Sequence, residues 1–367
     1  MKILAIETSC DDTGVAVLKI QSSKTEILSN IVSSQVKLHE KYGGIYPFLA
    51  KREHQKNLPP VLKKAFRQGL RLSSAECLQD KQKFEKPDLI AVTVGPGLEP
   101  CLWTGINFAI ELAKKMNLPL VPVNHIEAHI LANFIGKNSK SQIPNPKNIF
   151  PAVCLVVSGG HTQLILMKNI GKYQILGETR DDAAGECFDK VARILGLSYP
   201  GGPEVAKKAA KYNIRNKKYH IELPRPMIYQ KNYDFSFSGL KTAVLYDFKS
   251  QRPRIRKSEE YIREMCFEIQ QAAIDVLIHK TLKAAKSFKA KVIILGGGVA
   301  ANKELRKQLR KKIEKEMPHA VYYMPERKYC TDNALMAAVT AYYHQKEKTK
   351  NWKKIRANAN LKIGGYL

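Results

Sequence analysis

The sequence lacks the cysteine patterns that close disulfide-rich folds or bind zinc. Its seven cysteines are scattered over 367 residues, and no two of them form a Cys-x-x-Cys pair. We therefore expect neither a disulfide framework nor a cysteine-based zinc ribbon. Scattered cysteines of this kind are typical of a protein from a reducing compartment.

Long apolar segments are also missing. No stretch approaches the ~18 consecutive apolar residues that a membrane-spanning helix requires. The opening segment, MKILAIETSCDD, carries acidic residues where a signal peptide needs its apolar run. These absences predict a cytoplasmic protein with no membrane partner.

Acidic residues are few relative to basic ones. The chain has 33 Asp and Glu against 61 Lys and Arg, which gives a formal net charge of +28 at pH 7. A field of this sign attracts polyanions, above all nucleic acid, although lysines also serve solubility alone. Hydrophobic residues make up 44% of the chain, enough for a substantial interior, and the length favours two domains over one.

Two parts of the chain share one order of elements. In the first part we expect strands over 2–8, 15–20, 25–33, 89–94 and 120–123, with helices over 52–70 and 105–116. In the second part we expect strands over 152–157, 162–167, 173–179, 292–295 and 321–324. The repeat predicts an α/β protein of two similar lobes, each a mixed sheet with helices, with a cleft between two facing turns.

The turn after the first strand of each part has the composition of a phosphate-binding loop. The segment from Glu7 to Gly14 combines small, hydroxyl and glycine residues, whose N–H groups can approach a phosphate closely. Its Asp11 is an acid that can accept a proton or bind a cation, but an ordinary hairpin explains the turn equally well. The matching segment, Val156 to Thr162, lacks the acid, and its His161 is more simply a packed turn residue than a ligand.

Three consecutive glycines, Gly296 to Gly298, follow an apolar strand. They match a dinucleotide fingerprint only weakly, because a lysine-rich helix follows instead of a second strand that ends in an acid. The segment fits better as a contact for a nucleotide sugar or base. That group would pack against the glycines, and Asn302 would supply an amide.

Two histidines have the spacing of metal ligands on a helix that Asn124 caps. His125 and His129 are four residues apart, so their imidazoles share one helix face. At ~100° per residue, Glu127 lies ~200° from His125, which argues against a zincin-type peptidase with its His-Glu-x-x-His order. Chance pairing among nine histidines is the alternative.

Two histidines need a further ligand, and an acid from elsewhere in the chain is expected. The candidate is Asp332, which stands just before an expected helix over 334–343. Aspartate is also a good N-cap, and its position alone favours the cap over the metal.

Beyond these residues the chain resembles, essentially from end to end, the universal tRNA threonylcarbamoyladenosine transferase family, formerly labelled O-sialoglycoprotein endopeptidase. The resemblance rests on nine ordered motifs: IETSCDDTGVAV (6–17), GPGLEPCLWTG (95–105), NHIEAH (124–129), VVSGGHTQL (156–164), DDAAGECFDKVARILGL (181–197), YPGGP (199–203), FSFSGLKTA (235–243), GGGVAAN (296–302) and TDNALMAA (331–338).

The resemblance implies a fold and a set of site residues. The fold would be two ribonuclease-H-like lobes of the actin, Hsp70 and sugar-kinase superfamily, the first over 1–130 with 333–367 packed back on it and the second over 131–332. One divalent metal, Fe²⁺ or Zn²⁺, would bind to His125, His129 and Asp332, with Asp11 as the essential acid. Threonylcarbamoyl-AMP would contact a set in the second lobe: Val156, Val157, Ser158, Gly159, Gly160, Asp189, Gly202 and Asn302.

The resemblance also implies a reaction and partners. The threonylcarbamoyl group would move from threonylcarbamoyl-AMP, made by a separate synthase, to the N6 amine of adenosine 37 in tRNAs that read codons beginning with adenine, and AMP would leave. The implied partners are tRNA and accessory subunits, either an inactive paralogue with a small ATPase or a different set. The alternatives are a metallopeptidase, an ATP-dependent kinase or chaperone of the same fold, and a catalytically idle subunit.

Overall fold

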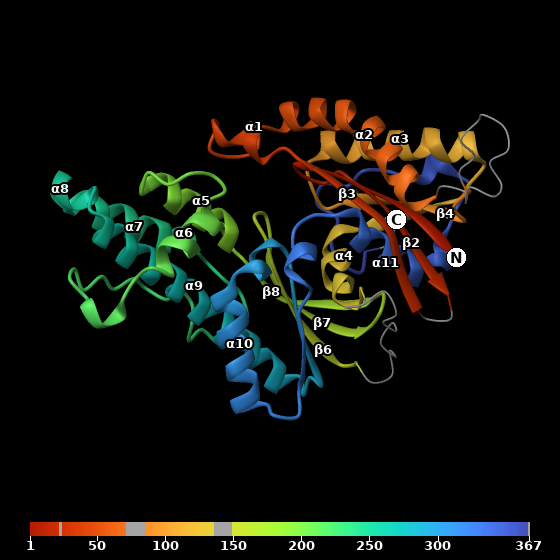
Figure 1. Cartoon of the computed structure of the whole chain (residues 1–367). Helices are drawn as coiled ribbons and strands as arrows, with labels where there is room; N and C mark the ends of the chain where they lie inside the picture. The colour runs from red at the N-terminus through yellow and green to blue at the C-terminus, as the bar shows by residue number, and fades with distance from the viewer. Residues whose placement is uncertain (22–23, 71–84, 136–148, 366–367) are drawn as a thin grey trace. The chain divides into compact units, whose positions relative to one another are not determined.

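The computed structural model describes residues 1–21, 24–70, 85–135 and 149–365 (Figure 1). The chain divides into two compact units: unit 1, Met1–Leu38, Ile45–Asn145 and Pro325–Leu367, and unit 2, His39–Gly44 and Pro146–Met324. The C-terminal segment thus belongs to the same unit as the N-terminal strands. Asp332, the last residue of the expected second lobe, also lies in unit 1.

The sheet of unit 1 has five strands in the order β3-β2-β1-β4-β5. They are β1 (Lys2–Glu7), β2 (Asp12–Gln21), β3 (Lys24–Ser34), β4 (Leu89–Gly95) and β5 (Leu120–Asn124). β1, β2 and β3 pair antiparallel, whereas β1, β4 and β5 run parallel. Because parallel strands end at the same edge of a sheet, Glu7, Gly95 and Asn124 all lie at one edge.

Helices cover both faces of this sheet. α2 (Pro47–Gly69) and α3 (Glu99–Met116) pack on one face, and α4 (His125–Leu131) and α11 (Ala334–Tyr343) lie on the other (Figure 1). A short helix, α1 (Val36–Glu40), precedes α2. α2 and α3 begin five and six residues before the predicted starts at 52 and 105. Pro47 and Pro100 stand in their first turns, where the missing N–H has no helical partner to lose.

Unit 2 repeats the same sheet. Its order is β10-β9-β6-β7-β8, with β6 (Ala152–Val157), β7 (Thr162–Asn169), β8 (Lys172–Glu178), β9 (Val292–Gly296) and β10 (Val321–Tyr323). In both sheets the first strand of the unit is central, two antiparallel strands follow on one side, and two parallel strands lie on the other. The predicted structural repeat is confirmed.

Six α-helices complete the described part of unit 2. They are α5 (Ala184–Ile194), α6 (Gly201–Ala209), α7 (Ser238–Ser250), α8 (Pro253–Arg256), α9 (Glu259–Ser287) and α10 (Lys303–Glu316). α9 contacts α6 and the central strand β6. Every residue of β4, β6 and β9 is buried, which explains why these strands appear in the sequence as continuous apolar runs without alternation.

Two absences expected from the sequence hold for the described residues. Each cysteine there is free, while Cys77 lies outside the described ranges. None of the helices in those ranges is both long enough and apolar enough to cross a membrane.

Candidate metal centre

The histidine pair is placed by the end of β5. The side chain of Asn124 accepts hydrogen bonds from the N–H groups of Ile126 (2.9 Å) and Glu127 (3.1 Å), so α4 begins at His125, as expected. One helical turn later His129 lies on the same face, and the centroids of the two imidazoles are 4.6 Å apart. Both rings are buried.

Asp332 completes the group from the other end of the chain. Its Oδ1 lies 3.2 Å from Nε2 of His129 and 3.6 Å from Nε2 of His125. The ligand atoms of the three residues all lie within 4.8 Å of one another. The N-cap of α11 is the next residue, Asn333, whose side chain accepts from the N–H of Met336. The prediction that Asp332 caps this helix is therefore wrong. The carboxylate of Asp332 faces the two histidines instead.

The environment of these side chains fits a cation. Nδ1 of His129 is buried and makes no hydrogen bond to the described residues, and Nε2 lies 3.2 Å from Asp332 without the geometry of a hydrogen bond. Buried polar atoms left in this way are costly. Burial lowers the pKa of His125, but the carboxylates of Asp332 and Glu7 outweigh burial and raise that pKa to about 9. The pocket thus favours positive charge. Two imidazoles and one carboxylate are a donor set for Fe²⁺ or catalytic Zn²⁺.

Glu127 faces away from this group. Its Oε1 lies 2.8 Å from Nε2 of His344, just beyond the end of α11, and Nδ1 of His344 lies 2.8 Å from Oε1 of Glu347. The predicted orientation of Glu127 is confirmed. A peptidase mechanism that uses Glu127 as the base beside the metal has no support in this geometry.

The turn that carries Asp11 lies at the same edge of the sheet. Oγ of Ser9 is 3.1 Å from Nδ1 of His125, which ties the turn to the histidine pair. From α2, the buried His54 places Nδ1 2.8 Å from Oγ1 of Thr13 and Nε2 2.9 Å from the carbonyl oxygen of Cys10. Sequence reasoning missed His54, because only the fold brings α2 onto this turn.

The neighbouring acid, Asp12, has an altered ionisation. Burial raises the pKa of its carboxyl group to about 7, and the nearby carboxylates of Asp332 and Asp11 act in the same direction. The Asp11 turn therefore carries a second acid, Asp12, whose carboxyl group holds its proton more tightly than an exposed aspartate does.

The predicted adenylate residues lie in unit 2, beginning with the turn after β6. The N–H of Ser158 donates to the carbonyl of His161 (2.8 Å), and Oγ of Ser158 accepts from the N–H of His161 (3.1 Å). His161 is thus a turn residue, the simpler of the two sequence readings. A Cβ placed on Gly159 or on Gly160 would meet no atom within 4 Å, so the backbone there is open to a ligand.

The glycine segment ends β9 beside the end of β6, where Val156 and Val157 are fully buried. Gly297 has φ of +88°, and a Cβ there would stand 2.3 Å from the carbonyl oxygen of Val157, so only glycine fits. A 3₁₀ turn, Gly298–Ala301, then leads to Asn302.

The amide of Asn302 already has partners within the protein. Oδ1 accepts from the N–H groups of Glu304 and Leu305 at the start of α10, and Nδ2 donates to Oε1 of Gln270 (2.9 Å). Asn302 is a helix N-cap, which the sequence analysis did not weigh for this residue.

The last two predicted residues are Asp189, on α5, and Gly202, in the first turn of α6. Oδ1 of Asp189 accepts from the N–H of Gly201 (2.7 Å), and burial raises the pKa of the Asp189 carboxyl group. Gly202 has open space where a Cβ would stand. Unit 2 therefore has backbone that is accessible to a ligand at Gly159, Gly160 and Gly202.

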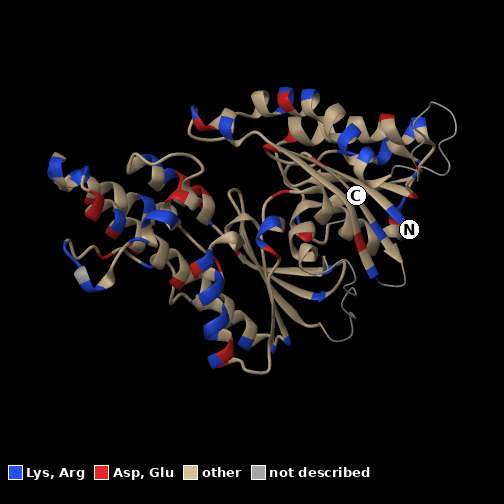
Figure 2. Cartoon of the chain, in the orientation of Figure 1, with Lys and Arg blue, Asp and Glu red and all other residues tan. Residues whose placement is uncertain are grey.

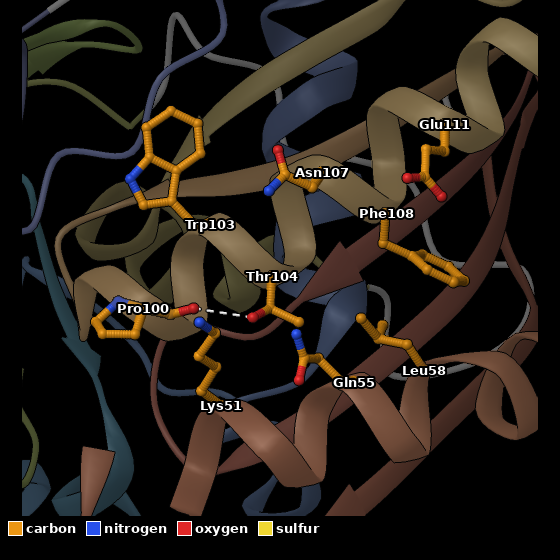
Figure 3. A pocket seen from close by; sticks show the side chains of 9 residues that line it. All are labelled: Lys51, Gln55, Leu58, Pro100, Trp103, Thr104, Asn107, Phe108 and Glu111. Atoms are coloured by element: carbon orange, nitrogen blue, oxygen red, sulfur yellow. Dashed lines mark hydrogen bonds between the residues drawn. The ribbon is translucent and has the colours of Figure 1, made fainter. Parts of the chain in front are cut away.

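A separate pocket of about 550 Å³ lies between α2 and α3 of unit 1 (Figure 3). Lys51 and Gln55 line it from α2, and Trp103, Thr104 and others line it from α3. None of its lining residues is a predicted site residue.

Comparisons with known proteins agree on one family. Residues 26–339 match the family model for tRNA N6-adenosine threonylcarbamoyltransferase. Proteins of that name from Syntrophomonas wolfei and Thermosipho africanus are each 44% identical to this chain, the first over 93% of this chain and 92% of its own length, the second over 99% and 100%.

Among solved structures, HypF of T. kodakarensis superposes with a TM-score of 0.54 at 14% identity, covering 94% of this chain and 47% of that one. A likeness at this identity shows the fold alone, which is an α/β architecture with two mixed sheets and helices.

Proposed function

The chain belongs to the tRNA N6-adenosine threonylcarbamoyltransferase family, and on that premise we propose the following reaction. The chain transfers the threonylcarbamoyl group from threonylcarbamoyl-AMP to the N6 amine of adenosine 37 in tRNAs that read codons beginning with adenine. The observation that carries the proposal is the convergence of His125, His129 and Asp332 beside the Asp11 turn, in a chain 44% identical to proteins of that name.

The reaction exchanges one bond at the carbamoyl carbon. The amine nitrogen forms a bond to that carbon, the bond from carbon to the phosphate oxygen breaks, and AMP leaves with the electron pair. The amine must lose a proton, because it is a weak nucleophile whose product is a neutral urea-type nitrogen. We assign to Asp11 the task of accepting that proton or of orienting the amine that releases it.

His125, His129 and Asp332 would hold one divalent metal, Fe²⁺ or Zn²⁺. Bound there, such an ion supplies Lewis-acid stabilisation of negative charge that develops on a phosphate or carbonyl oxygen. The family is metal-dependent in general, which agrees with this assignment. The side chain of Asp332 is 20% exposed, so the group is not sealed from substrate.

The adenylate would bind on unit 2. Of the backbone from Val156 to Gly160, the open glycines Gly159 and Gly160 would face the phosphate, and the buried end of β6 would hold that turn in place. Gly202 leaves room beside Asp189 for the sugar or base. Asn302 would support adenylate binding mainly by its position at the start of α10. Its amide already makes hydrogen bonds within the protein.

We propose tRNA as the macromolecular substrate. The formal net charge of +28 supports a polyanionic partner, and Figure 2 shows Lys and Arg along helices of both units, α10 among them. Accessory subunits, an inactive paralogue with a small ATPase or a different set, would dock on unit 1. Tyr46 (55% exposed) and Phe48 (67% exposed) leave apolar surface there, at the start of α2.

The test supplies the purified chain with its accessory subunits, threonylcarbamoyl-AMP and unmodified tRNA, and measures threonylcarbamoyladenosine by nucleoside mass spectrometry. We expect one modified nucleoside per tRNA and stoichiometric AMP. The matched control is the same tRNA with guanosine at position 37, which should stay unmodified. Release of AMP without a modified nucleoside, or modification of the control, would overturn the proposal.

A further inference from the structure

We propose that Glu7 is a positioning residue of the metal centre, which fixes the ring proton of His125 on Nδ1 and so leaves Nε2 free to bind the metal. The inference rests on the proposed metal site and concerns a residue that the sequence analysis did not assign.

Glu7 is the last residue of β1 and is fully buried. Its Oε1 accepts from the N–H of Ser9 (2.7 Å), and its Oε2 accepts from the hydroxyl of Thr93 on β4 (2.5 Å). The same Oε2 lies 3.5 Å from Nδ1 of His125. Both carboxylate oxygens are thus anchored by groups of the sheet, and the carboxylate is held against one nitrogen of the ring.

The two nitrogens of His125 face different neighbours. Nε2 faces Oδ1 of Asp332, the direction of the other ligands, whereas Nδ1 faces Oε2 of Glu7 and, at 3.1 Å, Oγ of Ser9. The hydroxyl of Ser9 is able to donate or to accept, so it does not choose the proton's position by itself. The carboxylate of Glu7 accepts at both of its oxygens, from the N–H of Ser9 and the hydroxyl of Thr93, and an ionised carboxylate only accepts.

The partners of Nδ1 therefore favour one direction. Oε2 of Glu7 can only accept from Nδ1, and the hydroxyl of Ser9 is able to accept there as well, so Nδ1 carries the proton. A metal binds the nitrogen without a proton, which is then Nε2. Partners of this kind commonly strengthen metal binding by orienting the ring and fixing its tautomer.

The substitution Glu7→Gln tests this direction without changing the size of the side chain. The amide oxygen must still accept from the N–H of Ser9, so the amide NH₂ takes the place of Oε2. A donor then faces Nδ1 of His125, and the proton moves to Nε2. We expect the dissociation constant for Zn²⁺, measured by competition with a chromophoric chelator, to rise about 10–100-fold.

One variant serves as the matched control. Glu127→Gln makes the same chemical change at another buried carboxylate, two residues from His125 in the same helix, but the side chain of Glu127 hydrogen-bonds to His344. This variant should bind Zn²⁺ within a few-fold of the wild-type protein. Equal affinities for Glu7→Gln and the wild type, or an equal loss in Glu127→Gln, would overturn the proposal.

A measurement on the unmodified chain keeps the test independent of whether Glu7→Gln folds. ¹⁵N-histidine NMR of the Zn²⁺-loaded protein should show His125 with a proton on Nδ1 and the metal on Nε2. Metal on Nδ1 would overturn the role of Glu7. Failure of the wild-type chain to bind Zn²⁺ or Fe²⁺ would instead overturn the proposed metal site itself.

Discussion

Replacing Glu127 with Gln should weaken unit 1 in a pH-dependent way while leaving the metal centre intact. Glu127 and His344 form a buried pair whose Oε1 and Nε2 are 2.8 Å apart. Burial lowers the pKa of His344, but Glu127 and then Glu347 outweigh burial and raise that pKa to about 9. Folding therefore favours the protonated imidazole.

The magnitude follows from the difference between the folded and unfolded pKa values of His344. The unfolded value is about 6.5, and each unit of difference corresponds to about 1.4 kcal/mol. The pair thus contributes about 3 kcal/mol to the free energy of unfolding below pH ~6.5. This contribution shrinks as the pH rises and is only a few tenths of a kcal/mol at pH ~9.

Thermal unfolding of the wild-type chain and Glu127→Gln, followed by circular dichroism from pH 6 to pH 9.5, measures this contribution. Glu347 remains in the variant, so we expect a loss of about 2 kcal/mol near pH 6.5, or roughly 2–3 °C in Tm for a protein of this size. The two curves should converge above pH 9, and metal content and transferase activity should stay near wild-type values. A loss of Tm that is the same at every pH, or a loss of metal, would refute the reasoning.

The acid in the turn, the third ligand and the basic surface give three further predictions. Asp11→Ala should abolish modification of tRNA while metal content and Tm stay unchanged, and a near-normal rate would reduce Asp11 to a turn residue. Asp332→Ala should lose the metal, whereas Asn333→Ala should keep it and lose about 1 kcal/mol with the N-cap; equal metal contents would contradict the assignment. The affinity for tRNA should fall with added salt, with a slope of log K against log salt of about 0.7–0.9 per phosphate contacted, and a slope near zero would leave the lysines without a role in binding.

Local patterns in the sequence were enough to predict much of the fold. The repeat could be predicted because each unit opens with two strands joined by a tight turn. The apolar residues of these strands alternate or run continuously, which marks them as strands. The two histidines were identifiable because the helical period alone places His125 and His129 together and Glu127 apart. These features depend on residues that are near one another in the chain.

The remaining site residues depend on contacts between distant segments. Asp332 and Asn333 are both good caps, and only the backbone geometry before α11 decides that Asn333 caps and Asp332 faces the histidines. Glu7 and Thr93 meet because β1 and β4 pair in parallel, which no local pattern indicates. His54 reaches the Asp11 turn only through the packing of α2 on the sheet.

The most direct measurement is anomalous X-ray scattering from crystals of the metal-loaded protein, recorded at the iron and zinc absorption edges. The account predicts one peak per chain, at about 2.0–2.2 Å from Nε2 of His125, Nε2 of His129 and a carboxylate oxygen of Asp332. A peak bound by other residues, or full metal loading with Asp332 uncoordinated, would contradict it.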